Sequence, residues 1–158
     1  MKFVCPLLVV KDIKQSQNFY EHILEQKVKY DFGENITFAG DFAIHLESHY
    51  IKLLQNDSYK VIKRSNNFEL YFETDKIEET YLKLKDNQIE FIHEILEQPW
   101  GQRVMRFYDL DYHIIEIGET MESVVKRLFN MGLTMDEICK KSSMPVEFVE
   151  SVINTLAK

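Results

Sequence analysis

An internal repeat constrains the fold of this chain more than any other feature of its sequence. A short apolar segment, a segment with helical periodicity and three more short apolar segments occur twice in the same order, over about residues 1–55 and 66–119. Each repeat alone is too thin to bury both faces of a sheet. We therefore predict an α+β fold, in which two strand-helix-three-strand (βαβββ) repeats form paired curved sheets around a shared cavity.

Periodicity and turn residues predict the elements of each repeat. In the first, Asp12 is typical of a helix N-cap, and the expected elements are a helix at 13–24 and strands at 3–10, 27–32, 36–39 and 42–47. In the second, the expected elements are a helix at 76–87 and strands at 68–73, 90–93, 102–108 and 113–118. A tight Asp-Leu-Asp-Tyr turn separates the last two strands. The polar stretch 49–67 is predicted to be an irregular connector.

Residues 120–158 lie outside the repeats and are predicted to form a helical extension. Helices are expected at 121–131, 134–141 and 145–156, with Thr134 as an N-cap ahead of Glu137. The hydrophobic spacing resembles a helix-turn-helix. However, the acidic and basic side chains of this segment cancel, whereas DNA contact needs a basic face. We therefore expect these helices to serve in dimerisation or as a lid over the cavity.

Composition excludes several classes of function. The 158 residues, 45% hydrophobic and 28% charged, suit a globular protein with one main core. The net charge of -7 gives no general attraction to nucleic acid or anionic membranes, and no apolar run is long enough to span a bilayer. The start of the chain lacks a signal-peptide pattern, so we expect a cytoplasmic protein. Cys5 and Cys139 fall in no CxxC spacing, so reduced thiols are expected.

Two motifs stand out in the repeats: VVKDIKQSQNFYEHIL in the first, and PWGQR followed by FYDLDYHIIEIGE in the second. They resemble the opening strand-helix signature and the closing hairpin of the vicinal oxygen chelate superfamily, which includes glyoxalase, bleomycin-resistance and extradiol-dioxygenase proteins. The resemblance implies one glyoxalase/bleomycin-resistance-like domain over residues 1–119. This superfamily places lyases, dioxygenases, thiol transferases and non-catalytic drug-binding proteins on one architecture, so the fold does not select the reaction.

The resemblance also implies candidate metal ligands. Metal-binding members take ligands from their first, fourth, fifth and eighth strands, and the corresponding positions here are Cys5, His45, Glu69 and Glu116. His45, Glu116 and Glu69 would hold a divalent ion such as Zn, Ni, Mn or Fe. Cys5 replaces the usual His. Glu116 is also the candidate catalytic carboxylate, which would move protons while the ion polarised vicinal oxygens of a substrate.

Three of these residues have a simpler interpretation. His45 is equally well a neutral, hydrogen-bonded strand residue. Glu116 can pair with Arg103 or Arg106 across neighbouring strands. Cys5 is small and apolar enough to be a buried core residue.

Aromatic residues make up 13% of the chain and supply flat apolar surface for a ligand cleft. The resemblance places Trp100, Tyr71, Phe107 and Tyr108 at the wall or mouth of the cavity. Arg103 suits a ligand carboxylate or phosphate, because its guanidinium group makes two parallel hydrogen bonds to such groups. Core packing is the alternative role of these aromatic residues, above all of Phe107.

Three functions follow from these observations. The first is a binding protein similar to the bleomycin-resistance branch, which takes a small planar or anionic molecule in an aromatic cleft. The second is a divalent-metal-dependent lyase or dioxygenase of the same superfamily. The third is a ligand-responsive regulator that uses the C-terminal helices. The expected partners are a small-molecule ligand and a second copy of the chain in a homodimer.

Overall fold

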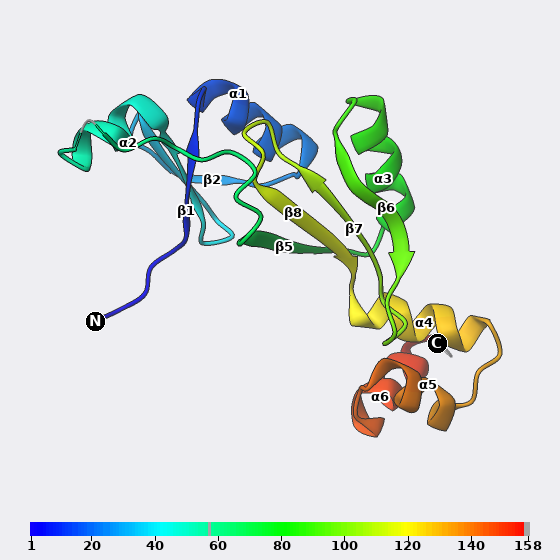
Figure 1. Ribbon diagram of the computed structural model, residues 1–158. Helices are drawn as coiled ribbons and strands as arrows, with labels where there is room; N and C mark the ends of the chain where they lie inside the picture. Colours follow the sequence, from blue (N-terminus) through cyan, green and yellow to red (C-terminus); the bar gives the residue numbers. More distant parts are fainter. Residues whose placement is uncertain (57, 157–158) are drawn as a thin grey trace. The chain divides into compact units, whose positions relative to one another are not determined.

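The computed structural model describes residues 1–56 and 58–156 of the chain. Asp57, in the predicted connector, and residues 157–158, at the end of the predicted extension, lie outside the described residues. The described strands form one four-stranded sheet in the order β1-β4-β3-β2 and another in the order β5-β8-β7-β6 (Figure 1). The same strand order in both sheets confirms the α+β fold and the internal repeat.

The chain divides into two compact units that do not follow the repeats strictly. The first unit contains residues 1–69 together with 108–114, and the second contains residues 70–107 together with 115–158. The turn between the last two strands of the second repeat therefore belongs to the first unit.

The first repeat contains four strands and three short helices. In chain order these are β1 (Leu7–Val10), α1 (Ile13–Asn18), the π-helix η1 (Phe19–Ile23), β2 (Val28–Asp31), β3 (Asn35–Phe38), β4 (Ala43–Leu46) and α2 (Glu47–Leu53). Strand β1 runs parallel to β4, with Val9 beside His45. Strands β2, β3 and β4 are joined in antiparallel pairs.

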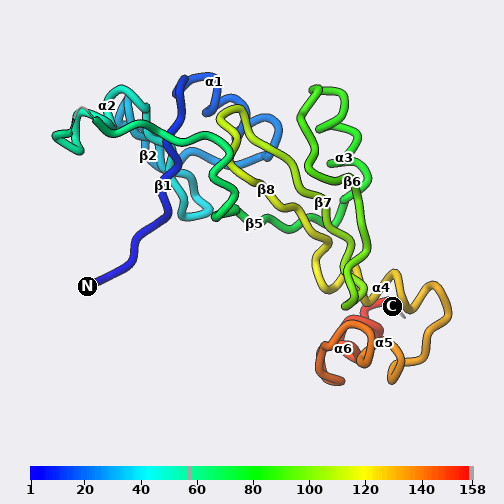
Figure 2. Tube along the Cα trace, in the orientation of Figure 1, coloured from blue at the N-terminus to red at the C-terminus, as the bar shows by residue number. Residues whose placement is uncertain are grey.

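Strand β1 begins four residues later than the predicted start at residue 3. Phe3 and Val4 are 81% and 72% exposed, and the stretch before β1 is extended (Figure 2). Pro6 has no backbone N–H to donate, but its carbonyl accepts a hydrogen bond from the Ala43 N–H at 3.0 Å. Sheet pairing therefore starts at Leu7.

The predicted helix over 13–24 is present, but it is not regular throughout. Asp12 caps it as expected, because its side chain accepts from the backbone N–H groups of Lys14 and Gln15. From Phe19 the helix widens into a π-turn, where the Leu24 N–H donates to the Phe19 carbonyl five residues before it. Phe19 and Tyr20 are both buried there.

The prediction of a wholly irregular connector was wrong at its start, because α2 covers its first residues. No side chain caps α2, and none of its residues is buried. A cap and an apolar stripe are the signals that identify a helix in a sequence, and α2 lacks both. The charges of Glu47 in the first turn and Lys52 in the last turn are favourable to the helix dipole.

The second repeat contains β5 (Glu69–Thr74), α3 (Ile77–Asp86), β6 (Phe91–Glu97), β7 (Arg103–Tyr108) and β8 (Ile114–Glu119). Strand β6 extends four residues beyond the predicted end at 93. Its antiparallel pairing with β7 shifts register twice, between Phe91 and His93 and between His93 and Leu96. These irregularities interrupt the alternation on which the sequence-based boundary depended.

Three C-terminal helices follow, α4 (Met121–Asn130), α5 (Met135–Ser142) and α6 (Val146–Leu156), and they gather together in Figure 1. Thr134 and Glu137 form the capping box expected from the sequence. The helices share an apolar core of six buried residues: Val124, Val125, Leu128, Ile138, Val149 and Val152. Among the described residues, no helix combines the length and apolar character needed to cross a bilayer.

Candidate functional site

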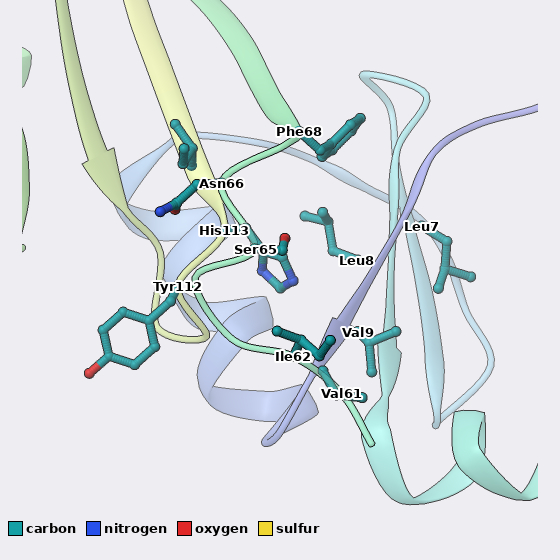
Figure 3. Close-up of a pocket in the computed structure, with 11 residues that line it drawn as sticks. Leu7, Leu8, Val9, Val61, Ile62, Ser65, Asn66, Phe68, Tyr112 and His113 are labelled. Atoms are coloured by element: carbon teal, nitrogen blue, oxygen red, sulfur yellow. The ribbon is translucent and has the colours of Figure 1, made fainter. Parts of the chain in front are cut away.

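The first unit contains a pocket of about 260 Å³ beside β1 (Figure 3). Its walls come from β1, from the segment before β5 and from the turn that leads into β8. The lining residues are Leu7, Leu8, Val9, Val61, Ile62, Ser65, Asn66, Phe68, Tyr112, His113 and Ile114. Most of these lining residues are apolar, and Ser65, Asn66, Tyr112 and His113 supply the polar groups, a mixture usual for small-molecule sites.

The turn at this pocket is organised by Asp109, which is only 6% exposed. Its Oδ1 accepts from the backbone N–H groups of Asp111 and His113 at 2.9 and 2.8 Å. Its Oδ2 accepts from the Tyr20 hydroxyl at 2.7 Å. Burial and the neighbouring Asp109 carboxylate raise the pKa of Tyr20 well above its usual value, so this hydroxyl keeps its proton and donates.

His113 completes the set of donors around Asp109. Its Nδ1 lies 2.8 Å from Oδ2 of the carboxylate. An ionised carboxylate only accepts hydrogen bonds, so Nδ1 of His113 must carry a proton. In Figure 3 the His113 ring lies in the middle of the labelled side chains.

Asp111 and two cations tie the same turn to the rest of the first unit. Asp111 accepts from the backbone N–H of Lys11 at 3.1 Å and from Nζ of Lys63 at 3.2 Å. The Arg64 guanidinium lies 4.2 Å from the centre of the Tyr112 ring and 4.6 Å from that of Tyr108. The hydroxyl of Tyr108, a predicted ligand-binding residue, donates to Asn66 at 3.1 Å.

His45 is buried on β4, as expected for a residue that faces the interior. Its Nδ1 lies 3.1 Å from the Asn35 side-chain amide, and its Nε2 lies 2.9 Å from Nδ1 of His49. The amide nitrogen only donates, so Nδ1 of His45 accepts and Nε2 carries the proton. Burial, followed by the charge of His49, lowers the pKa of His45, which favours the neutral ring.

The other two candidate ligands of the first unit are Cys5, which lies before the first strand, and Glu69, which begins β5. Cys5 is partly exposed, has a free thiol and precedes β1. Glu69 is the first residue of β5 and is exposed.

Glu116, on β8 in the second unit, is 7% exposed. Its Oε2 forms an ion pair with the Arg106 guanidinium of β7 and accepts no hydrogen bond of ordinary geometry from the described residues. Glu116 therefore has a charged partner on the neighbouring strand, as its simpler interpretation expects.

Arg103 is engaged with protein carboxylates. Its Nε donates to Oε1 of Glu119 at 2.9 Å, and the guanidinium also pairs with Glu78. Arg127 of α4 donates to the same Glu119 at 2.9 Å. Burial raises the pKa of Glu119, but the hydrogen bonds from Arg103 and Arg127 outweigh it, and the net shift is downward.

The remaining predicted aromatic residues of the second unit differ in exposure. Trp100 and Tyr71 are 42% and 48% exposed. Both contact Gln102: the Trp100 indole N–H donates to its Oε1 at 3.0 Å, and its Nε2 donates to the Tyr71 hydroxyl at 2.8 Å. Phe107 is fully buried and packs edge-on against Phe91 in the core of this unit.

A divalent metal would need three or more ligands brought together. Among the described residues, no such group of His, Cys, Asp or Glu side chains is arranged to hold an ion. Both ring nitrogens of His45 contact protein groups, and Glu116 pairs with Arg106. These residues do not fit a metal centre in the arrangement seen, so we derive no chemical step through a metal.

Comparison with protein families matches residues 3–122 to the glyoxalase-like domain. The chain belongs to this family. The match confirms the resemblance to the vicinal oxygen chelate superfamily that the two sequence motifs indicated. No curated protein sequence matches the chain significantly.

Solved structures resemble this glyoxalase-like chain over three quarters or more of its length. A protein of unknown function from Agrobacterium tumefaciens is 39% identical, with a TM-score of 0.68, over 76% of this chain and 94% of that one. A glyoxalase/bleomycin resistance protein/dioxygenase from Nocardioides is 18% identical, with a TM-score of 0.58, over 75% and 83% of the two chains. The fosfomycin resistance protein FosX from Listeria monocytogenes, complexed with Mn(II) and sulfate, is 22% identical, with a TM-score of 0.56, over 80% and 97%.

Sequence reasoning about this glyoxalase-like domain missed Asp109 and His113 as members of a site. The turn itself was predicted from Asp-Leu-Asp-Tyr, but its contacts with Tyr20, Lys11 and Lys63 are distant in sequence. The available signal was an Asp followed four residues later by a His across a tight turn. That spacing lets one carboxylate accept from both the backbone and the imidazole of the same residue.

Proposed function

We propose that this glyoxalase-like protein binds a small, planar, largely apolar molecule in the pocket of the first unit. The observation that carries the proposal is the pocket itself, about 260 Å³ in volume, with apolar walls and a few polar groups. Sites for drug-sized ligands usually measure roughly 300–1,000 Å³, so a smaller molecule is favoured. Phe68, which is exposed, supplies a flat surface for a planar ring.

The proposal is tested with 4-nitroanisole, a neutral planar probe, by equilibrium dialysis against the intact protein. We expect saturable binding that Val9→Phe weakens about tenfold, because the larger side chain fills part of a pocket in which contact area supplies the affinity. Leu53→Phe makes a similar exchange on exposed α2, outside the pocket lining, and should leave binding unchanged. Absence of saturable binding by the wild type would contradict the proposal.

A metal-dependent lyase or dioxygenase is the second candidate function. Two observations favour it: the structural likeness to a fosfomycin resistance protein complexed with Mn(II), and the lowered pKa of His45, which favours the neutral ring that metals bind. The family pattern places the ligands at His45, Glu69, Glu116 and Cys5. Ion binding would have to replace the contacts of His45 with Asn35 and His49 and the pairing of Glu116 with Arg106, because the described residues are not arranged to hold an ion as they stand.

This second candidate is tested by metal content. Protein purified without chelator is analysed before and after addition of Zn, Ni, Mn or Fe(II), for the wild type and for His45→Ala. Stoichiometric metal in the wild type that the variant loses would support the metal-dependent enzyme. Uptake that is equal in both proteins, or absent from both, would count against these ligands.

We also propose that the chain forms a homodimer through β6. This strand lies at the edge of its sheet, and Ile92 and Leu96 on it are 43% and 55% exposed. An edge strand with exposed apolar side chains favours association. Sedimentation of the wild type should give a dimer and that of Leu96→Asp a monomer, whereas a monomeric wild type would refute the proposal.

A further inference from the structure

The polar side of the pocket in the first unit is built around an acid-base pair. His113 is held by Asp109, and the side chain of His113 keeps 22% of its surface exposed while that of Asp109 keeps 2%. The imidazole therefore borders the pocket, and the carboxylate lies behind it. In metal sites and in enzymes, a carboxylate in this position fixes the ring orientation and tautomer of a histidine.

His113 lines the pocket, and the ring nitrogen that does not contact Asp109 is the one left for a ligand. Since Nδ1 of His113 holds the proton shared with Asp109, Nε2 carries the lone pair in the neutral ring. Among the described residues, Nε2 of His113 has no hydrogen-bond partner. This nitrogen is accessible, so a hydrogen-bond donor of a ligand in the pocket can take the place of water there.

The charges around the pair favour an anion after proton transfer. Asp109 faces Nδ1 of His113 and is itself bonded by Tyr20, while Asp111 of the same turn is paired with Lys63. Arg64 lies against the ring of Tyr112, which lines the pocket. Once Nε2 is protonated, the imidazolium places positive charge beside the ligand, and Asp109 balances the imidazolium from behind.

We propose that the Asp109–His113 pair makes this pocket a site for weak organic acids, such as phenols and enols, which bind as anions after transferring a proton to Nε2 of His113. The O–H bond of the ligand breaks, an N–H bond forms at Nε2, and the ligand oxygen keeps the electron pair. The product is an oxyanion paired with the imidazolium. This inference rests on the proposed function, because it needs the pocket to admit a ligand.

The test compares two probes of nearly the same shape, 4-nitrophenol and its methyl ether, 4-nitroanisole. The phenol has a proton to give, and its anion absorbs visible light that the neutral form does not. Titration is carried out with the intact protein at a pH where free 4-nitrophenol is mostly neutral. We expect the visible nitrophenolate band to appear as protein is added, and binding of the phenol to be about tenfold tighter than that of the ether, the worth of one charge-assisted hydrogen bond.

Variants separate proton transfer from packing. In His113→Gln the nitrophenolate band should disappear, while the affinity for 4-nitroanisole should change less than twofold. His22→Gln makes the same exchange at an exposed histidine of the first unit and should retain the band. Tyr20→Phe removes one donor from Asp109 and should shift the pH at which the band appears, which a purely structural role of Tyr20 would not do. Thermal unfolding of each variant confirms that it is folded.

The outcomes distinguish the two proposals. If 4-nitroanisole does not bind, the proposed function fails. If it binds but bound 4-nitrophenol remains neutral, or if its anion forms equally in His113→Gln, the pocket stands and the proton-transfer inference is overturned.

Discussion

Arg127 of α4 donates from its guanidinium to both oxygens of Glu119 at the end of β8, at 3.2 Å to Oε1 and 2.9 Å to Oε2. The same guanidinium contacts the Gly101 carbonyl and pairs with Glu97 at 3.2 Å. Lys141 of α5 reaches Glu97 as well, at 2.6 Å. The C-terminal helices are therefore attached to the sheet of the second unit through a few charged side chains.

The first prediction concerns this attachment. Arg127→Ala leaves the buried carboxylate of Glu119 with Arg103 as its remaining guanidinium partner, and we expect it to lower the free energy of unfolding by about 2–3 kcal/mol. Lys126→Ala, at the exposed neighbouring position, should change it by about 0.5 kcal/mol or less. Urea unfolding measures both. Equal effects of the two substitutions would show that the Glu119 contacts add no stability.

The second prediction is a loss of stability in acid. The pKa of Glu119 is lowered from its usual value of 4.5 in the folded protein. Between the folded pKa and 4.5, the folded state therefore binds fewer protons than the unfolded state. The stabilisation is complete above about 4.5 and is lost as the pH falls through the folded pKa. Unfolding of the wild type and of Glu119→Gln, measured over this range, should converge towards low pH. A difference that does not depend on pH would contradict this role.

The third prediction concerns His45, whose pKa is lowered from the usual value of 6.5 by burial and by His49. As the pH falls through 6.5, His45 becomes protonated in the unfolded chain but stays neutral in the folded protein. Stability should therefore decrease from pH 6.5 down to the folded pKa of His45 and then level off. In His45→Gln this part of the pH dependence should disappear, whereas His22→Gln should retain it. Chemical denaturation at several pH values provides the measurement.

The fourth prediction tests the shared core of the C-terminal helices. Leu128 is fully buried there, and Leu128→Ala should cost about 3 kcal/mol through lost burial and the cavity left behind. The next residue, Phe129, is 40% exposed, and Phe129→Ala should cost roughly 1 kcal/mol or less. Calorimetry of the two variants and of the wild type measures the difference in the free energy of unfolding. Similar costs would mean that Leu128 does not hold the three helices together.

The sequence predicted the elements whose signals are local. Asp12 and Thr134 cap their helices as expected, because a short polar side chain next to an apolar periodicity is enough to satisfy the first N–H groups of a helix. The internal repeat likewise predicted two sheets, since strand order follows from the same succession of elements in both halves. Helix α2 was not predicted, because it has neither a side-chain cap nor a stripe of buried apolar residues.

The sequence by itself thus determined the fold class, the repeat, the family and the position of the last turn. Only the tertiary structure decided which residues surround a pocket. Tyr20 and Asp109 are 89 residues apart in the chain and 2.7 Å apart in the first unit. The hydrophobic periodicity of the sequence does not predict such a contact, because the contact depends on how the Asp109 turn packs against a helix from the other repeat. The position of the Asp109–His113 pair beside β1 likewise depends on packing between segments that are distant in sequence.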